Sequence, residues 1–330
     1  MVTNPVCGCL PITKANQIWQ AEQIASAVPL TEHVWRQDAE PGTYAWDAVF
    51  EEILDRRIRL CESYAEIGFC LFPWQILRHL NARHKLTDRF YWNQGSVPSC
   101  SMHGACHSAQ ASVLVDLAFG APRVYDALNP IYPFYIARGE NLGGGLDLAA
   151  TANQLNRFGT YAVSDVGADN ISAPRDWREY SDRALRRQAA VIYLEHDLVE
   201  KIFRACRAGF HVTFGSVTWF KEGTIDRNGV KTLTGTGYGG HAQSLGSWRK
   251  VGGTEYVFLT NSWGDAYGTG DEEEPACGGW LNRDKVAVLA ESMPRYGAPF
   301  IALYENPVRA KDAKLLGSLT VPFPENFRRE

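Results

Sequence analysis

Apolar side chains recur at helical spacing through the first half of the chain. From Ala45 onward they lie three or four residues apart with charged residues between them, at Trp46, Val49, Phe50, Ile53, Leu54, Ile58 and Cys61. This spacing gathers the apolar side chains on one stripe and predicts a surface helix packed against a core. Similar patterns predict helices over residues 15–27, 76–84, 101–119, 147–158, 182–191 and 197–208.

The apolar period changes to two after Gly209. Val212, Phe214, Ser216 and Thr218 alternate with their neighbours, which predicts a β-strand. Further strands are predicted over residues 241–248, 255–260, 280–288 and 300–305. Helices therefore gather in the first half and strands in the second, which predicts an α+β fold rather than alternating βαβ units.

The composition is that of an ordinary globular protein. The chain has 330 residues, 45% of them hydrophobic and 21% charged, which suffices for a full core. The net charge of -4 and the lack of a Lys/Arg-rich block argue against nucleic acid or an anionic membrane as a partner. The apolar runs are much shorter than the ~20 residues of a membrane span.

The cysteines and the first residues bear on the compartment. Eight cysteines are too few for a disulfide framework at this length. Residues 1–14 do not show the basic and apolar segments of a secretory signal. We therefore expect reduced thiols and a cytoplasmic location, with a virion or another assembly as the alternative.

Four residues form a candidate catalytic set. Cys100 lies where a Pro-containing loop meets a predicted helix, and the N–H groups of a helix N-terminus favour a thiolate. Gln94 precedes it by six residues and is placed to donate to an oxyanion beside the Cys100 N–H. His241 begins a predicted strand, and Asn261 follows the next one with an amide carbonyl suited to orient an imidazole. Trp263 is placed to shield this pair from water.

These residues lie in segments that resemble the motifs of papain-like cysteine peptidases. The segments are Asn93-Gln-Gly-Ser-Val-Pro-Ser-Cys100, Gly240-His241-Ala242 and Asn261-Ser-Trp-Gly264, in the order that the family has. Gly143, Gly144 and Gly145 fall where the family has its substrate-binding edge, and Asn129-Pro-Ile-Tyr-Pro133 resembles the stretch before it. The resemblance covers roughly residues 92–289.

The resemblance implies a two-lobe fold with an active-site cleft between a helical lobe and a β-rich lobe. It also implies peptide-bond hydrolysis through a thioester. Cys100 would attack, His241 would shuttle the proton, Asn261 would orient His241, and Gln94 with the Cys100 N–H would bind the oxyanion. The implied partner is a peptide or protein substrate, bound with help from Trp263 and the three glycines. No metal and no organic cofactor is implied.

The chain departs from the family pattern at several positions. Ser101 stands where the family has Trp, Val97 where it has a disulfide-forming Cys, and Tyr267 where it has Trp. Residues 269–277 lengthen a loop, and residues 1–90 lack the inhibitory pro-segment motifs. We interpret residues 1–90 as an accessory or partner-binding extension, 91–305 as the peptidase domain and 306–330 as a C-terminal tail.

Other interpretations remain. The thioester can pass to an amine, which would make the protein a thiol acyltransferase. A non-enzymatic structural or interaction protein, such as a virion or complex component, would keep the fold and dock through residues 1–90. Cys100, His103, Cys106 and His107 have zinc-like spacing, but four ligands on one straight helix cannot surround a tetrahedral ion. The glycines of residues 235–240 match a dinucleotide fingerprint, yet a strand rather than a helix follows them.

Overall fold

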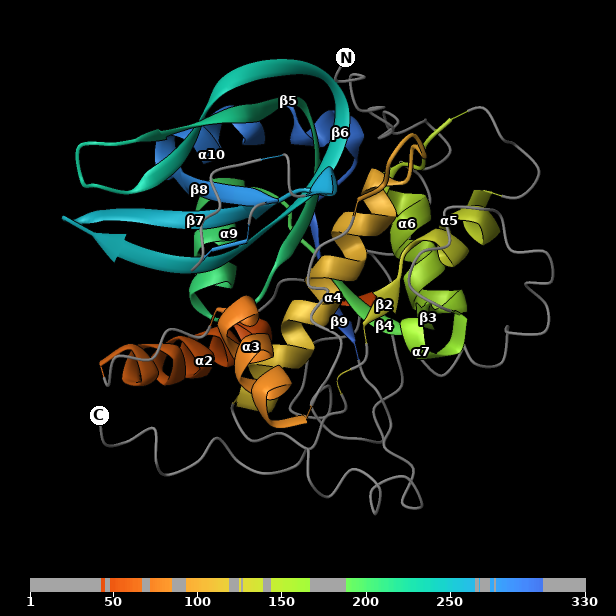
Figure 1. Ribbon diagram of the computed structural model, residues 1–330, viewed down its shortest axis with the longest axis horizontal. Helices are drawn as coiled ribbons and strands as arrows, with labels where there is room; N and C mark the ends of the chain where they lie inside the picture. The colour runs from red at the N-terminus through yellow and green to blue at the C-terminus, as the bar shows by residue number, and fades with distance from the viewer. Residues whose placement is uncertain are drawn as a thin grey trace.

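A seven-stranded sheet carries the architecture of the protein. The computed structural model describes residues 43–44, 48–66, 72–84, 93–118, 125, 127–138, 144–166, 188–264, 267, 274–275 and 277–304. Within them the strand order is β1-β4-β9-β5-β6-β7-β8 (Figure 1). The strands are β1 (Thr43–Tyr44), β4 (Ala189–Tyr193), β5 (Val212–Ile225), β6 (Lys231–Val251), β7 (Thr254–Thr260), β8 (Gly278–Asn282) and β9 (Phe300–Tyr304). A second sheet pairs β2 (Leu128–Asn129) with β3 (Tyr161–Ala162).

Both faces of the large sheet are covered. Along β7, Tyr256 and Phe258 belong to one core cluster, and Val257 and Leu259 belong to the other. Successive side chains of a strand point to opposite faces, so a nearly continuous apolar run is expected where both faces are buried. The first cluster holds helix α4 (Cys100–Ala118), and the second holds α9 (Leu198–Arg207) and α10 (Arg283–Ala290).

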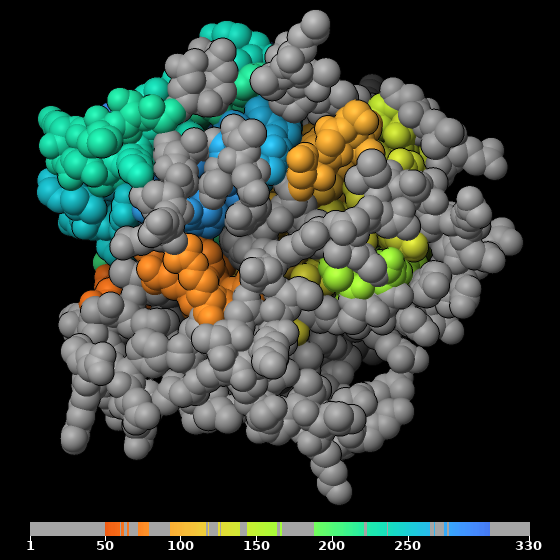
Figure 2. Space-filling view, viewed as in Figure 1, coloured from red at the N-terminus to blue at the C-terminus, as the bar shows by residue number. Residues whose placement is uncertain are grey.

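Helix α4 lies between the sheet and the remaining helices (Figure 1). Those helices are α5 (Ile131–Arg138), α6 (Leu148–Asn153), the π-helix η2 (Gln154–Phe158) and α7 (Val163–Val166), while the 3-10 helix η5 (Met293–Tyr296) packs on β5. Small residues let α4 approach the sheet: a Cβ added to Gly104 would lie 3.0 Å from the Gln243 carbonyl oxygen on β6. Figure 2 shows the teal and blue atoms of the β-rich side and the yellow-green atoms of the helical side on opposite flanks.

The described part of residues 1–90 packs into the same core. Helix α2 (Ala48–Glu66) buries Phe50, Ile53, Leu54 and Ile58, as its apolar stripe predicts. Helix α3 (Pro73–His84) buries Trp74, whose ring lies 4.7 Å from that of Phe258. The boundaries at residues 90 and 305 stay a prediction, and the tail 306–330 lies outside the described residues.

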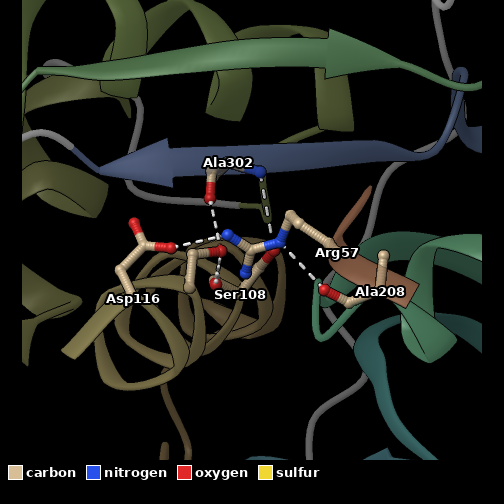
Figure 3. A network of polar contacts seen from close by, with 6 residues as sticks. Arg57, Ser108, Asp116, Ala208 and Ala302 are labelled. Atoms are coloured by element: carbon tan, nitrogen blue, oxygen red, sulfur yellow. Dashed lines mark hydrogen bonds and ion pairs between the residues drawn. The ribbon is translucent and has the colours of Figure 1, made fainter. Parts of the chain in front are cut away.

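A buried ion pair fastens α2 to α4 (Figure 3). The Arg57 side chain donates to Asp116 Oδ1 at 2.7 Å and to the Ala208 carbonyl oxygen at 2.9 Å. Its guanidinium also lies 4.2 Å from the centre of the Phe210 ring. Arg57 therefore joins α2, the C-terminal half of α4 and the residue after α9.

The α+β class is confirmed, and two predicted elements are corrected. The strand predicted over residues 280–288 ends at Asn282, because the Asn282 side chain accepts from the Lys285 N–H and caps α10. The helix predicted over 182–191 is wrong at its described end, where Ala189–Tyr193 form the buried strand β4. The helix predicted over 15–27 lies outside the described residues. None of the helices in the described ranges is long and apolar enough to cross a membrane.

Candidate active site

Cys100 is the first residue of α4 and lies against strand β6. The Ala242 N–H on β6 points at Cys100 Sγ, with 3.4 Å between nitrogen and sulfur. Ala242 directly follows His241, so this contact places the thiol beside the segment of β6 that carries His241. Gly104, one helical turn after Cys100, permits this close approach of α4 to β6.

The imidazole of His241 is oriented by Asn261. His241 Nε2 lies 2.7 Å from Asn261 Oδ1, and the same oxygen accepts from the Ser262 N–H at 2.7 Å. An amide oxygen only accepts, so Nε2 carries the hydrogen and Nδ1 of the neutral ring is an acceptor. Nδ1 is buried and has no hydrogen-bond partner among the described residues. The sequence-predicted contact between His241 and Asn261 is therefore present.

Aromatic rings cover the His241–Asn261 pair. The Trp263 ring stacks on the His241 ring with 4.4 Å between their centres and 23° between their planes. Trp219 and Tyr267 meet Trp263 edge-on, at 4.9 and 5.2 Å. Sequence analysis identified Trp263 but missed Trp219, because Trp219 lies on β5, outside every motif. The rings exclude water from the hydrogen bond, which strengthens it.

Gln94 is held by the segment that follows Asn261. The Gln94 N–H donates to the Ser262 carbonyl at 2.8 Å, and the Ser262 hydroxyl donates to Gln94 Oε1 at 2.5 Å. With its oxygen held in this way, the side-chain nitrogen faces the loop that leads to Cys100 and donates to the Val97 carbonyl at 2.8 Å. Ser262 thus positions Gln94, a function that the sequence did not reveal. The oxyanion-binding role of Gln94 stays a prediction.

The whole site is buried. Cys100, His241 and Gln94 have no exposed surface, and Asn261 is 1% exposed. The expectation that Cys100 and His241 line an open cleft is not met in this structure. The pKa of His241 is lowered to about 4, mainly by burial; the bond to Asn261 opposes this shift, and the nearby His103 adds to it. At neutral pH the imidazole is therefore uncharged.

The remaining predicted residues lie elsewhere on the helical side. Gly144 and Gly145 come just before α6, whose first turn is capped by the Asp147 carboxylate, and Gly143 lies outside the described residues. Their role in substrate binding stays a prediction. Of the zinc-like set, Cys106 contacts the Thr160 hydroxyl and His103 bonds to Ser99. In the described ranges, no three or more His, Cys, Asp or Glu side chains are arranged to hold a metal ion.

The cysteines of the described region are thiols. Cys61, Cys100, Cys106, Cys206 and Cys277 form no disulfide bond. Cys7, Cys9 and Cys70 lie outside the described residues.

No family model and no curated protein sequence matches the chain. Among solved structures it is similar to a digestive procathepsin L 3 of Tenebrio molitor, with 14% identity and a TM-score of 0.44. That match covers 64% of this chain and 65% of the other, which is just under two thirds. It is also similar to a procathepsin B of Trypanosoma congolense (13%, TM-score 0.46, 66% and 72% covered) and to bromelain of Ananas comosus (14%, 0.43, 64% and 92%).

Proposed function

We propose that the protein is a cysteine peptidase of the papain-like type. The observation that carries the proposal is the 2.7 Å bond between His241 Nε2 and Asn261 Oδ1. His241 lies on β6, and the N–H of the next residue on this strand, Ala242, is directed at Cys100 Sγ. A nucleophile, a base and a group that orients the base are the parts that acyl transfer through a thiol requires. The order and spacing of the motifs support the same assignment.

In the proposed reaction, the Cys100 thiol gives its proton to His241 Nδ1 as Sγ attacks the carbonyl carbon of a peptide bond. The Cys100 N–H and the Gln94 amide would stabilise the oxyanion. The C–N bond breaks, His241 returns the proton to the leaving amine, and a thioester remains on Cys100. Water then attacks the thioester with His241 as base, which releases the acid and restores the thiol. Throughout the reaction, Asn261 holds Nε2 of His241, which leaves Nδ1 on the opposite side of the ring free to exchange the proton.

Burial adds a condition to this proposal. A peptide cannot reach Sγ while Cys100 has no exposed surface. Turnover therefore requires a state in which Cys100 Sγ is accessible to the substrate. Desolvation is the main cause of the low pKa of His241. Access of solvent to the site would therefore raise this pKa and make His241 a stronger base.

The test compares Cys100→Ser and His241→Ala with wild type in hydrolysis of a fluorogenic peptide mixture. Each change should lower kcat/KM by roughly a thousandfold or more, because nucleophile and base act as a unit. Cys206→Ser, which removes another buried thiol, is the matched control and should retain turnover. Full activity of Cys100→Ser would show that the catalytic assignment is wrong and would favour the interaction-protein alternative. Products joined to an added amine would instead identify an acyltransferase.

A further inference from the structure

A concave site lies far from Cys100, between α2, α9 and the end of β6. It is a cavity of about 330 Å³ lined by Cys61, Glu62, Ala65, Phe72, Cys206, Arg207, Gly209, Ser247, Trp248, Arg249 and Lys250. A Cβ added to its lining residue Gly209 would meet Val115 at 2.7 Å, so the cavity adjoins the C-terminal end of α4. Cys100 lies 15 residues earlier on that helix, about 22 Å away at 1.5 Å per residue.

The wall of this cavity is apolar. Phe72, Ala65 and Trp248 contribute hydrocarbon and ring surface, and two thiols complete the wall. Burial raises the pKa of Cys61 to about 11 and raises that of Cys206 as well. Both sulfurs are therefore protonated at neutral pH and act as small apolar groups rather than nucleophiles.

The rim of the cavity is basic. Arg207, Arg249 and Lys250 line the cavity together with Glu62, and Arg249 pairs with Glu274, which lies outside the lining, at 3.1 Å. Arg207 donates to Glu62 at 3.0 Å and packs its guanidinium 5.2 Å from the Trp248 ring centre. Lys250 is exposed at the mouth. Because Arg207 pairs with Glu62 and Arg249 pairs with Glu274, Lys250 supplies the positive charge at the mouth. The cavity thus joins an apolar interior to a cationic group, which suits a ligand that is apolar at one end and anionic at the other.

Ser247 supplies an independent sign of a ligand. Its side chain is 3% exposed, and its hydroxyl has no hydrogen-bond partner among the described residues. Its backbone has a φ of 45°, in the left-handed region, at the β-bulge between Gly246 and Trp248. An unpaired buried hydroxyl and a left-handed non-glycine residue both cost free energy, and such costs concentrate at functional sites. A carboxylate oxygen in the cavity would accept from this hydroxyl.

We propose that this cavity binds a medium-chain fatty acid, with its hydrocarbon tail among Phe72, Ala65 and Trp248 and its carboxylate near Ser247 and Lys250. The volume of about 330 Å³ equals that of about eleven waters at ~30 Å³ each. This space accepts a chain of roughly ten heavy atoms and excludes long-chain lipids. The proposal does not depend on the peptidase activity.

The test is titration calorimetry of the full chain with decanoate, 1-decanol and decyltrimethylammonium, each below its micelle concentration. Saturable 1:1 binding is expected for decanoate, at least tenfold weaker binding for decanol, and none for the cation. Lys250→Glu at the mouth should weaken decanoate binding about tenfold, and Ala65→Trp should abolish it by filling the cavity. Arg295→Glu, which reverses an exposed charge on η5 outside the cavity, is the matched control and should bind like wild type.

Cys100→Ser should also bind decanoate like wild type, which separates this site from the proposed catalytic one. The absence of saturable decanoate binding would overturn the proposal. Equal binding by wild type and Ala65→Trp would overturn it too, as would equal affinity for decanoate and the decyl cation. A Lys250→Glu variant that keeps the wild-type unfolding curve but loses decanoate affinity would support it.

Discussion

Four histidines are buried in the core and make the fold sensitive to acid. Desolvation lowers the pKa of His103 and His241 to about 4 and that of His107 and His211 to about 3. In the unfolded chain a histidine has a pKa of about 6.5. Because the folded values are the lower ones, unfolding takes up protons. The histidines stabilise the fold fully above pH 6.5, and this contribution is lost as the pH falls towards 4.

The size of the loss follows from linkage. At pH 5.5, protonation of one such histidine in the unfolded chain shifts the folding equilibrium towards unfolding by a factor of about 11, which is about 1.4 kcal/mol. At pH 7.5 the same protonation shifts it by less than about 0.1 kcal/mol. Each buried histidine therefore costs about 1.3 kcal/mol between pH 7.5 and 5.5. Four of them cost about 5 kcal/mol, a large part of the 5–15 kcal/mol of an ordinary domain.

The assay is urea unfolding at pH 7.5, 6.5 and 5.5 on wild type, His107→Gln and His196→Gln. His107→Gln removes one of the four protonation sites. Its free energy of unfolding should therefore fall by about 1.3 kcal/mol less than that of wild type between pH 7.5 and 5.5. The exposed His196 is the matched control, and its variant should lose as much as wild type. A free energy of unfolding that stays level between pH 7.5 and 5.5 would refute the reasoning. Equal losses in wild type and His107→Gln would refute it as well.

Two substitutions and one labelling experiment probe the packing around α4. Arg57→Met should lower the free energy of unfolding by about 3–5 kcal/mol in urea titrations, since it removes the counter-ion of a buried carboxylate; adding Asp116→Leu should recover much of this loss, and no recovery would contradict the ion-pair account. Gly104→Ala should destabilise by about 1–3 kcal/mol, because its Cβ meets backbone on β6; a wild-type unfolding midpoint would argue against the close approach. Native Cys100 should react slowly with iodoacetamide by mass spectrometry and faster in mild urea, because it is buried; immediate labelling would show an open site.

The elements with a strong period could be predicted from the sequence. The apolar stripe of α2 and the alternation along β5 each specify one element type, and the structure has them. The run Ala189–Tyr193 has five apolar residues in succession, so its period says nothing, and only its pairing with β9 makes it a strand. Asn282 ends β8 and caps α10 through one side-chain bond, which the apolar pattern does not reveal.

The candidate site divides in the same way. The bond between His241 and Asn261 could be predicted, because both residues lie in ordered motifs at the ends of strands. Trp219 and His103 lie outside the motifs, and only the packing of β5 and α4 brings them to Trp263 and His241. The burial of Cys100 was not predictable either, because it depends on which segments cover the site rather than on the residues that form it.

The position of α2 changes how the N-terminal region can be tested. Its apolar stripe predicts a surface that must be covered, but the pattern does not say whether a partner or the same chain covers it. In the structure the stripe packs on the sheet of this chain, and Arg57 pairs with Asp116 of α4. Deleting residues 1–90 would therefore expose the core and break a buried ion pair. If the deletion variant failed to assemble, the cause could be unfolding just as well as the loss of a docking surface. Cys100→Ser changes one atom and leaves this packing intact, which makes it the sharper way to separate a peptidase from an interaction protein.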